Sequence, residues 1–199
     1  MSRSVLSDLA RQRTLYTNEG LLNARKAIHS LSPGAPPIPR ALGDQELFEA
    51  AAFAQLIRPC HFGLHPLRIA KVRPAPEHLT LVIDCDPQLI FDVLQDLLPT
   101  WDPEGDVHGV EGLRILGWTD NSLDLHQPGW RTLIRLTGAP RWLWRRAEQD
   151  RANETVASGC VPCWRTLPNT WTHTPRGLAG QRLAATDRAV PYRRGSLGR

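Results

Sequence analysis

The sequence predicts an α+β fold: N-terminal helices, then a β-α-β-β-β-α core with a mainly antiparallel sheet, and an irregular C-terminal tail. Three observations predict it. A short apolar run over residues 79–83 leads directly into a helical pattern over residues 87–98. Three further strand-like runs follow on tight turns, and strands joined by tight turns pair antiparallel. Helical periodicity fills most of the first 57 residues, and none is evident after residue 152.

Two helices are predicted before the first proline-rich stretch. Ser4 is expected to cap a helix that ends near Arg13. Thr17 is expected to cap a second helix that ends near Leu31. In both segments apolar residues recur at three- and four-residue spacing, so each helix has one face suited to packing.

A linker and a third helix come next. Residues 32–43, SPGAPPIPRALG, are too rich in proline and glycine for a helix or a strand. Asp44 is then expected to cap a helix over residues 45–57, and Pro59 to stop it. The predicted segments are a helical N-terminal segment (1–31), a linker (32–43), the α+β core (44–152) and an irregular basic tail (153–199).

The central strand and helix give the clearest pattern in the chain. Leu79–Ile83 is a short apolar run with β-branched residues, which is typical of a buried strand. Asp86 can cap the following helix, and Pro87 suits its first position because the missing N–H has no intrahelical partner there. The helix presents an apolar side that could cover a sheet, and Pro99 ends it; the apolar positions are Leu89, Ile90, Val93, Leu94, Leu97 and Leu98.

The second half of the core is predicted as a meander and a last helix. Residues 113–118, 122–126 and 130–137 have the composition of strands. Asp120-Asn121 and Gln127-Pro128-Gly129 supply the turns between them. Pro140 is expected to open a helix over residues 141–151. From residue 153 onward prolines and glycines interrupt every pattern, so the tail is expected to be irregular.

Charge is distributed unevenly along the chain. Residues 1–43 carry a net charge of +4, residues 44–130 carry −9, and residues 131–199 carry +9. The basic end could pair with the acidic middle within the fold, or it could face an anionic partner. Because all but two of the 24 basic residues are arginine, a GC-rich genome also explains part of the composition.

The N-terminal quarter resembles the opening of some uncharacterised actinobacterial proteins. Those proteins have a Tyr-Thr helix motif, an Ile-Pro linker and a Gln…Glu-Ala helix. The resemblance implies a GC-rich bacterial source and no particular activity. The matching residues are Tyr16, Thr17, Ile38, Pro39, Gln45, Glu49 and Ala50.

A first candidate site is the stretch WRTLIRLTGAPRWLWRRAEQDR, in which arginines and tryptophans are interspersed. Such a composition is typical of surfaces that neutralise phosphates and stack bases. The alternative is that the tryptophans belong to the core and the arginines surround them. The predicted nucleic-acid-binding residues are Arg131, Arg135, Arg141, Trp142, Trp144, Arg145 and Arg146.

A second candidate is the pair Asp84 and Asp86 at the carboxyl end of the central strand. Two carboxylates at this position could hold Mg²⁺ and a phosphate substrate. The run LVIDCDPQL resembles the first motif of haloacid-dehalogenase-type phosphatases, which implies Asp84 as nucleophile and Asp86 as acid/base. That family has Thr or Val where this chain has Gln88. The alternative is that Asp86 only caps the helix beside a solvated Asp84.

A third candidate is a zinc site. Cys160 and Cys163 have the CxxC spacing that suits zinc, and Cys60, His61 and His65 could complete the ligand set if the tail returned to the third helix. A redox pair and ordinary reduced thiols are the alternatives, and four cysteines in 199 residues are too few for a disulfide scaffold. The sequence does not require a cofactor; zinc at these cysteines and histidines is the alternative, and magnesium belongs only to the enzyme interpretation of Asp84 and Asp86.

These patterns predict a small cytoplasmic bacterial binding protein whose C-terminal third contacts nucleic acid. The alternatives are a magnesium-dependent phosphoryl-transfer enzyme using Asp84 and Asp86, and a protein–protein interaction module whose basic tail engages an acidic partner. The start of the chain lacks the apolar region of a secretory signal, and no apolar run approaches the roughly 18 residues that span a bilayer. A membrane partner is therefore not expected, and the sequence does not specify an oligomeric state.

Overall fold

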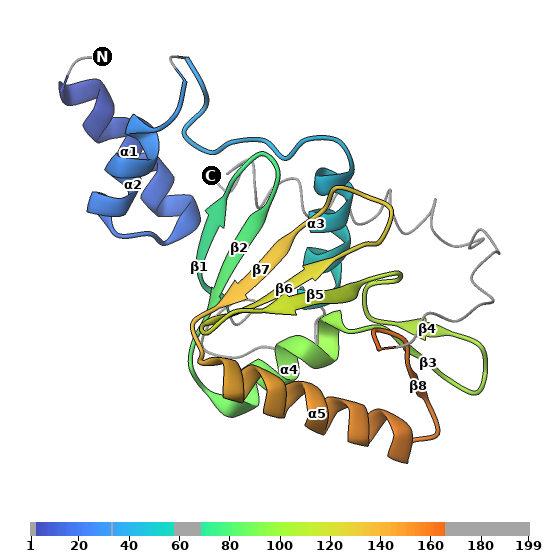
Figure 1. Cartoon of the computed structure of the whole chain (residues 1–199). Helices are drawn as coiled ribbons and strands as arrows, with labels where there is room; N and C mark the ends of the chain where they lie inside the picture. Colours follow the sequence, from blue (N-terminus) through green and yellow to red (C-terminus); the bar gives the residue numbers. More distant parts are fainter. Residues whose placement is uncertain (1–2, 33, 58–68, 166–199) are drawn as a thin grey trace.

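The computed structural model describes residues 3–32, 34–57 and 69–165. The elements in these ranges follow the expected α+β order with additional short strands (Figure 1). In chain order they are α1 (Arg3–Thr17), α2 (Leu21–His29), α3 (Asp44–Leu56), β1 (Ile69–Pro74), β2 (Leu79–Ile83), α4 (Pro87–Leu97), β3 (Thr100–Trp101), β4 (Val107–His108), β5 (Arg114–Trp118), β6 (Ser122–His126), β7 (Ile134–Thr137), α5 (Arg141–Ala157) and β8 (Val161–Pro162).

The main sheet has five strands in the order β1-β2-β7-β6-β5. Only β2 and β7 run parallel, and the other three pairings are antiparallel. This confirms a mainly antiparallel sheet and the β5–β6–β7 meander. The strands β4, β3 and β8 form a second, smaller sheet at one end of the molecule (Figure 1).

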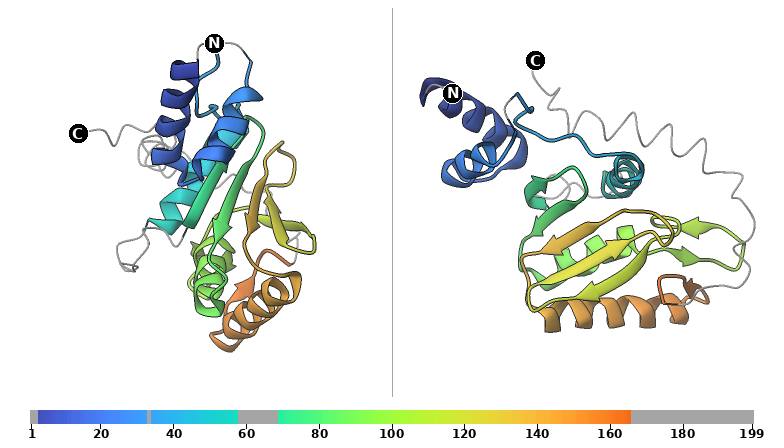
Figure 2. Two further views of the ribbon diagram at one scale, coloured as in Figure 1. Left: turned by 90° about the vertical axis from the view of Figure 1, so that its left-hand side faces the viewer. Right: turned by 45° about the horizontal axis from the view of Figure 1, so that its top comes forward.

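The two faces of the main sheet differ in polarity. Leu81, Leu136 and Leu123 lie in register across β2, β7 and β6, and all three are fully buried. The alternating positions on these strands face the other way, because successive side chains of a strand point to opposite sides. The helices α4 and α5 lie side by side along the molecule (Figures 1 and 2), and their buried residues join these leucines in one core.

The helix α4 confirms the central prediction. The Asp86 carboxylate accepts hydrogen bonds from the backbone N–H groups of Gln88 and Leu89, and Pro87 is the first helical residue. Its inner face is fully buried through Ile90, Val93, Leu94 and Leu97. An N-cap and an apolar stripe are local properties, which is why sequence alone locates this helix.

Three of the predicted caps are wrong. Ser4 is the second residue of α1, which begins at Arg3, and therefore does not cap it. The helix α1 continues to Thr17, whose hydroxyl donates to the carbonyl of Arg13 instead of capping α2. Asn18, with φ of 53°, follows α1, and Gly20 precedes α2. Asp44 is the first residue of α3 rather than its cap, a position taken by Gly43.

The predicted meander also differs in detail. The segment 130–133 is not a strand, and β7 begins only at Ile134. The buried Gln45 amide of α3 pairs with Leu133 instead: the Leu133 N–H donates to Gln45 Oε1 at 2.8 Å, and Gln45 Nε2 donates to the Leu133 carbonyl at 3.0 Å. The Leu133 carbonyl also accepts from the Leu79 N–H of β2 at 3.0 Å, so the Gln45 side chain bonds to Leu133 in addition to the strand.

Several features escaped the sequence patterns, among them the short strands β3 and β4. The edge strand β1 contains Lys71 and Arg73 and ends at Pro74, so its apolar alternation is weak. The helix α5 continues to Ala157, beyond the expected end at residue 151. A short strand, β8, then pairs with β3 and brings Trp164 into the core, so the chain beyond residue 152 is ordered at least to residue 165.

Gly138 fixes the direction in which the chain leaves the sheet. Its φ is 108°, and a Cβ at this position would overlap the carbonyl oxygen of Ile83 on the neighbouring strand β2. Only glycine fits both conditions. The turn carries the chain from β7 directly into α5, and it thereby sets which residues of α5 face the core.

Candidate functional site

The candidate site is the outer face of α5, which begins next to the turn between β5 and β6. Pro140 takes the N-cap position, and the Arg141 N–H donates to the Asp120 carbonyl at 2.8 Å. These contacts hold the start of the helix against the sheet. The rotation of the helix about its axis then decides which of its tryptophans and arginines reach solvent.

The two tryptophans of α5 lie on opposite sides of the helix. Trp144 is fully buried, and its Nε1 donates to the carbonyl of Ala139 at 3.0 Å. Trp142 is 62% exposed. Positions two apart on an α-helix differ by about 200° in direction, so one tryptophan must turn away when the other faces the core. The prediction that Trp144 stacks on a base is therefore wrong, and Trp142 is the accessible aromatic residue.

The five predicted arginines fall in three different places. Arg131 is exposed in the loop before β7, at the opposite end of that strand from α5. Arg135 lies on β7 and makes a bidentate pair with Asp124 on β6, with both N–O distances at 2.7 Å. This hydrogen bonding raises the pKa of Arg135. Only the arginines of α5 share one surface with Trp142, so the predicted set does not form a continuous phosphate-binding surface.

The arginines of α5 have neighbours of their own. The guanidinium of Arg145 lies over the ring of Trp118, 6.0 Å from its centroid, which is cation–π distance. Arg146 is 3.7 Å from the carboxylate of Asp150, one helical turn further on. Arg141, Arg145 and Arg146 are all exposed nonetheless, so α5 is basic at its N-terminal end.

A ridge runs along the outer face of α5. Trp142, Gln149 and Val156 recur at seven-residue spacing, which places them in line and opposite the buried side of the helix. Val156 is 63% exposed, as much as Trp142. Arg145 and Arg146 flank the ridge near its start, and Asp150 flanks it next to Gln149. We call Trp142, Gln149, Val156 and these three charged residues the α5 ridge.

The inner side of α5 fastens the C-terminal part of the described chain. Glu148 accepts hydrogen bonds from Trp164 Nε1 at 2.6 Å and from Arg165 Nε and Nη2 at 2.6 and 2.9 Å. This pairing raises the pKa of Arg165. Glu148 itself belongs to the basic C-terminal third, so this contact is internal to that third. The pairing of the basic end with the acidic middle that the sequence suggested is made by Arg135 with Asp124.

The predicted phosphoryl-transfer pair lies at the surface, directly before α4. Asp84 and Asp86 are both exposed, and one oxygen of Asp86 is used by the backbone of α4. Across residues 3–32, 34–57 and 69–165, no three His, Cys, Asp or Glu side chains are grouped so that they could hold a metal ion. The geometry therefore favours the helix-capping interpretation of Asp86 over the catalytic one.

The predicted zinc ligands are only partly described. Cys160 and Cys163 flank the short strand β8, with Cys160 half-buried and Cys163 fully buried. Burial raises the pKa of the Cys163 thiol, and the nearby Arg114 guanidinium offsets part of that effect. Cys60, His61 and His65 lie outside the described residues.

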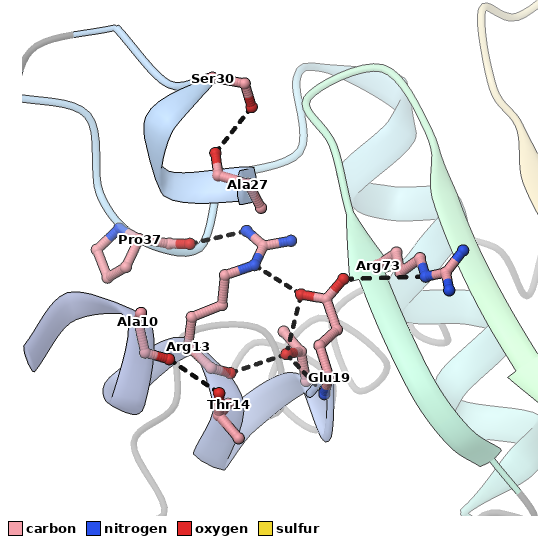
Figure 3. A network of polar contacts seen from close by, with 9 residues as sticks. Ala10, Arg13, Thr14, Glu19, Ala27, Ser30, Pro37 and Arg73 are labelled. Carbon is pink, nitrogen blue, oxygen red and sulfur yellow. Dashed lines mark hydrogen bonds and ion pairs between the residues drawn. The ribbon is translucent and has the colours of Figure 1, made fainter. Parts of the chain in front are cut away.

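The polar groups that the sequence patterns did not single out lie at the N-terminal helices (Figure 3). The buried Arg13 donates from Nε to the carboxylate of Glu19 at 2.7 Å and from Nη1 to the carbonyl of Pro37 at 2.9 Å. Arg73 of β1 approaches the other oxygen of Glu19 at 3.9 Å. Arg13 and Glu19 are six residues apart in the sequence, and α1 ends between them. This spacing matches neither helical nor strand periodicity, so the sequence does not indicate that they pair.

The described hollows do not offer a ligand pocket. A gap lined by Tyr16, Ile38, Phe53 and Val72 has room for only about 10 Å³, close to the limit for a single water. An open hollow of about 430 Å³ lies on α1 and α2, lined by Ser4, Leu6, Ser7 and Arg25, and it is a surface depression. The convex α5 ridge therefore remains the strongest candidate site.

Within the described ranges, no helix has both the length and the apolar character needed to cross a membrane. No protein-family model, curated protein or solved structure matches this chain.

Proposed function

We propose that this chain is a protein-interaction module that docks through the α5 ridge. The observation that carries the proposal is the exposure of Trp142 and Val156, two large apolar side chains on the side of α5 opposite the core. An exposed tryptophan in line with a second apolar residue is typical of binding surfaces, where aromatic anchors supply much of the affinity. This proposal uses a different surface from the basic tail that the sequence suggested.

The distribution of charge also supports a protein partner. A nucleic acid presents a uniform row of negative phosphates, so its binding surface is expected to be basic throughout. The α5 ridge instead contains charges of both signs, with Arg145 and Arg146 near its start and Asp150 next to Gln149. A protein surface can match such a mixture, and matching charges would fix the orientation of the partner.

Affinity purification from the source cells tests the proposal. Wild-type bait should retain one or more proteins, and baits carrying Trp142→Ala or Val156→Ala should lose them. The matched control is Leu22→Ala, because Leu22 is an apolar residue of α2 that is 67% exposed and lies outside the α5 ridge. Retention that is the same for all four baits would contradict the proposal, as would retention abolished by nuclease.

Nucleic-acid binding remains the second candidate, and one observation favours it. Arg141, Trp142 and Arg145 surround the N-terminus of α5, where the helix dipole also attracts phosphate. Filter binding should then show retention of single-stranded oligonucleotide that falls steeply with salt, and Arg141→Ala with Arg145→Ala should flatten the slope by about two units. Absence of retention at micromolar protein and low salt would exclude this candidate.

The proposed setting is the cytoplasm of a bacterium. Cys85 is exposed at the start of α4, and an exposed thiol suits a reducing compartment. Fractionation of the source cells with an antibody against the chain would test this placement, and recovery from the culture medium would contradict it.

A further inference from the structure

We infer that the partner of the α5 ridge is a second copy of this chain, bound through an antiparallel pair of α5 helices with its two-fold axis at Gln149. This inference rests on the proposed function and names its partner. The inference depends on the self-complementarity of the α5 ridge and not on any single residue.

The spacing along the α5 ridge is symmetric about Gln149. Trp142 precedes it by seven residues and Val156 follows it by seven. At 1.5 Å per residue each apolar side chain lies about 10.5 Å from the centre. In an antiparallel pair centred at Gln149, Trp142 of each copy therefore packs against Val156 of the other. The Gln149 amide donates to Asn153 Oδ1 at 2.8 Å and accepts from Arg165 Nη2 at 3.0 Å within its own chain, so the axis passes between two glutamines that are already hydrogen-bonded. This is an isologous contact, in which the same surface serves both partners.

The charges of the α5 ridge agree with the same arrangement. At about 100° per residue, Arg146 and Asp150 lie on the same flank of the ridge, about 40° and 80° from the line of Trp142. A two-fold axis perpendicular to the plane of an antiparallel helix pair places the same flank of each helix side by side. Arg146 of each copy then faces Asp150 of the other, on both sides of the two-fold axis. A parallel pair would instead place the basic halves against each other.

This self-complementarity selects the second copy over an unrelated partner. The complement of the α5 ridge is a helix with an apolar residue opposite Trp142, another opposite Val156, and an acidic residue opposite Arg146. Among the described elements, α5 in the reverse direction provides this pattern. One helix pair is a small interface, so the dimer is expected to be weak, with a dissociation constant on the order of micromolar.

Sedimentation of the full chain across a concentration series tests the inference. The wild type should pass from monomer to dimer, and Trp142→Ala should raise the dissociation constant about tenfold or more. Gln149→Leu should lower it by about tenfold, because two apolar side chains replace two amides at the axis. Leu22→Ala, the control outside the α5 ridge, should leave it unchanged.

A charge exchange gives the sharpest readout. Arg146→Glu and Asp150→Lys should each sediment as monomers, because each places like charges opposite one another on both sides of the two-fold axis. An equimolar mixture should form a heterodimer, because the acidic side chain introduced in one copy then faces the basic side chain introduced in the other. Circular dichroism confirms that each variant is folded.

The outcomes separate this inference from the proposed function. A wild type that stays monomeric at several hundred micromolar, or a mixture that fails to associate, overturns the inference. If bait in the affinity experiment still retains other proteins in a Trp142-dependent way, the proposed function stands with a different partner. If neither self-association nor Trp142-dependent retention is found, both fail.

Discussion

Two arginine–glutamate contacts hold the two ends of the described chain, and they differ in how far water reaches them. The side chains of Arg13 and Glu19 are 4% and 5% exposed. Those of Arg165 and Glu148 are 37% and 11% exposed. The same pair of chemical groups is therefore desolvated at the N-terminal end and partly hydrated at the C-terminal end. A group that cannot return to water depends fully on its partner, so the two pairs should respond very differently to mutation.

The two contacts also fasten different numbers of segments. Arg13 and Glu19 connect α1, the segment before α3, and β1, which forms the edge of the sheet (Figure 3). Asn18 adds a hydrogen bond of 2.7 Å from its amide to the carbonyl of Ala70 on the same strand. Glu148 connects α5 only with Trp164 and Arg165 and their neighbours. The comparison predicts a graded series of effects.

The largest effect is expected at Glu19. Glu19→Ala leaves the buried Arg13 without its carboxylate and should lower the free energy of unfolding by about 3–5 kcal/mol. The measurement is chemical denaturation followed by circular dichroism. The double variant Arg13→Met with Glu19→Leu should recover much of this loss, because it removes both charges together. A double variant as unstable as Glu19→Ala would show that packing, and not the unpaired charge, sets the cost.

A smaller effect is expected at Glu148. Glu148→Ala leaves the indole N–H of the buried Trp164 without an acceptor, while Arg165 can turn to water, so the expected loss is about 1–3 kcal/mol. Chemical denaturation monitored by tryptophan fluorescence measures it. The control is Arg165→Ala, which keeps the Trp164 hydrogen bond and should cost less than Glu148→Ala. If Glu148→Ala proved as costly as Glu19→Ala, exposure would not be the property that separates the two contacts.

The smallest effect is expected at a third pair, Asp102 and His108, which is the most hydrated. The Asp102 carboxylate accepts a hydrogen bond from the Asp106 N–H and lies 2.8 Å from His108 Nε2, and these contacts lower the pKa of Asp102. Because the folded-state pKa lies below the ordinary value of 3.8, the stabilisation is present above that pH and is lost as pH falls through the folded value. His108→Asn should move the pKa of Asp102 upward.

Nuclear magnetic resonance titration of the Asp102 carboxyl carbon measures this shift. The control is His78→Asn, which changes an imidazole outside the β3–β4 turn. An identical pKa of Asp102 in the wild type and in His108→Asn would show that the backbone hydrogen bond from Asp106 alone holds the carboxylate in its charged form.

The sequence determined the elements whose signals are local. Asp86, Pro87 and the apolar stripe of α4 lie within one short segment, and cap and periodicity together located the helix. The strands β2 and β6 were predicted to the residue for the same reason. Where the partner of a residue lies far along the chain, prediction failed: the Leu133 N–H donates to the side chain of Gln45, 88 residues away, and β7 begins only at Ile134.

The candidate site shows the same division. The sequence placed Trp142, Trp144 and their arginines on one helix, and it indicated that they could not all share one narrow face. Only the tertiary structure decided which of them would be buried, because the turn at Gly138 and the packing of α5 against α4 set the rotation of the helix. Helix formation depends on neighbours within a few residues, whereas helix orientation depends on contacts between distant segments. The sequence therefore predicted that α5 is a helix, but it did not predict which of its residues face solvent.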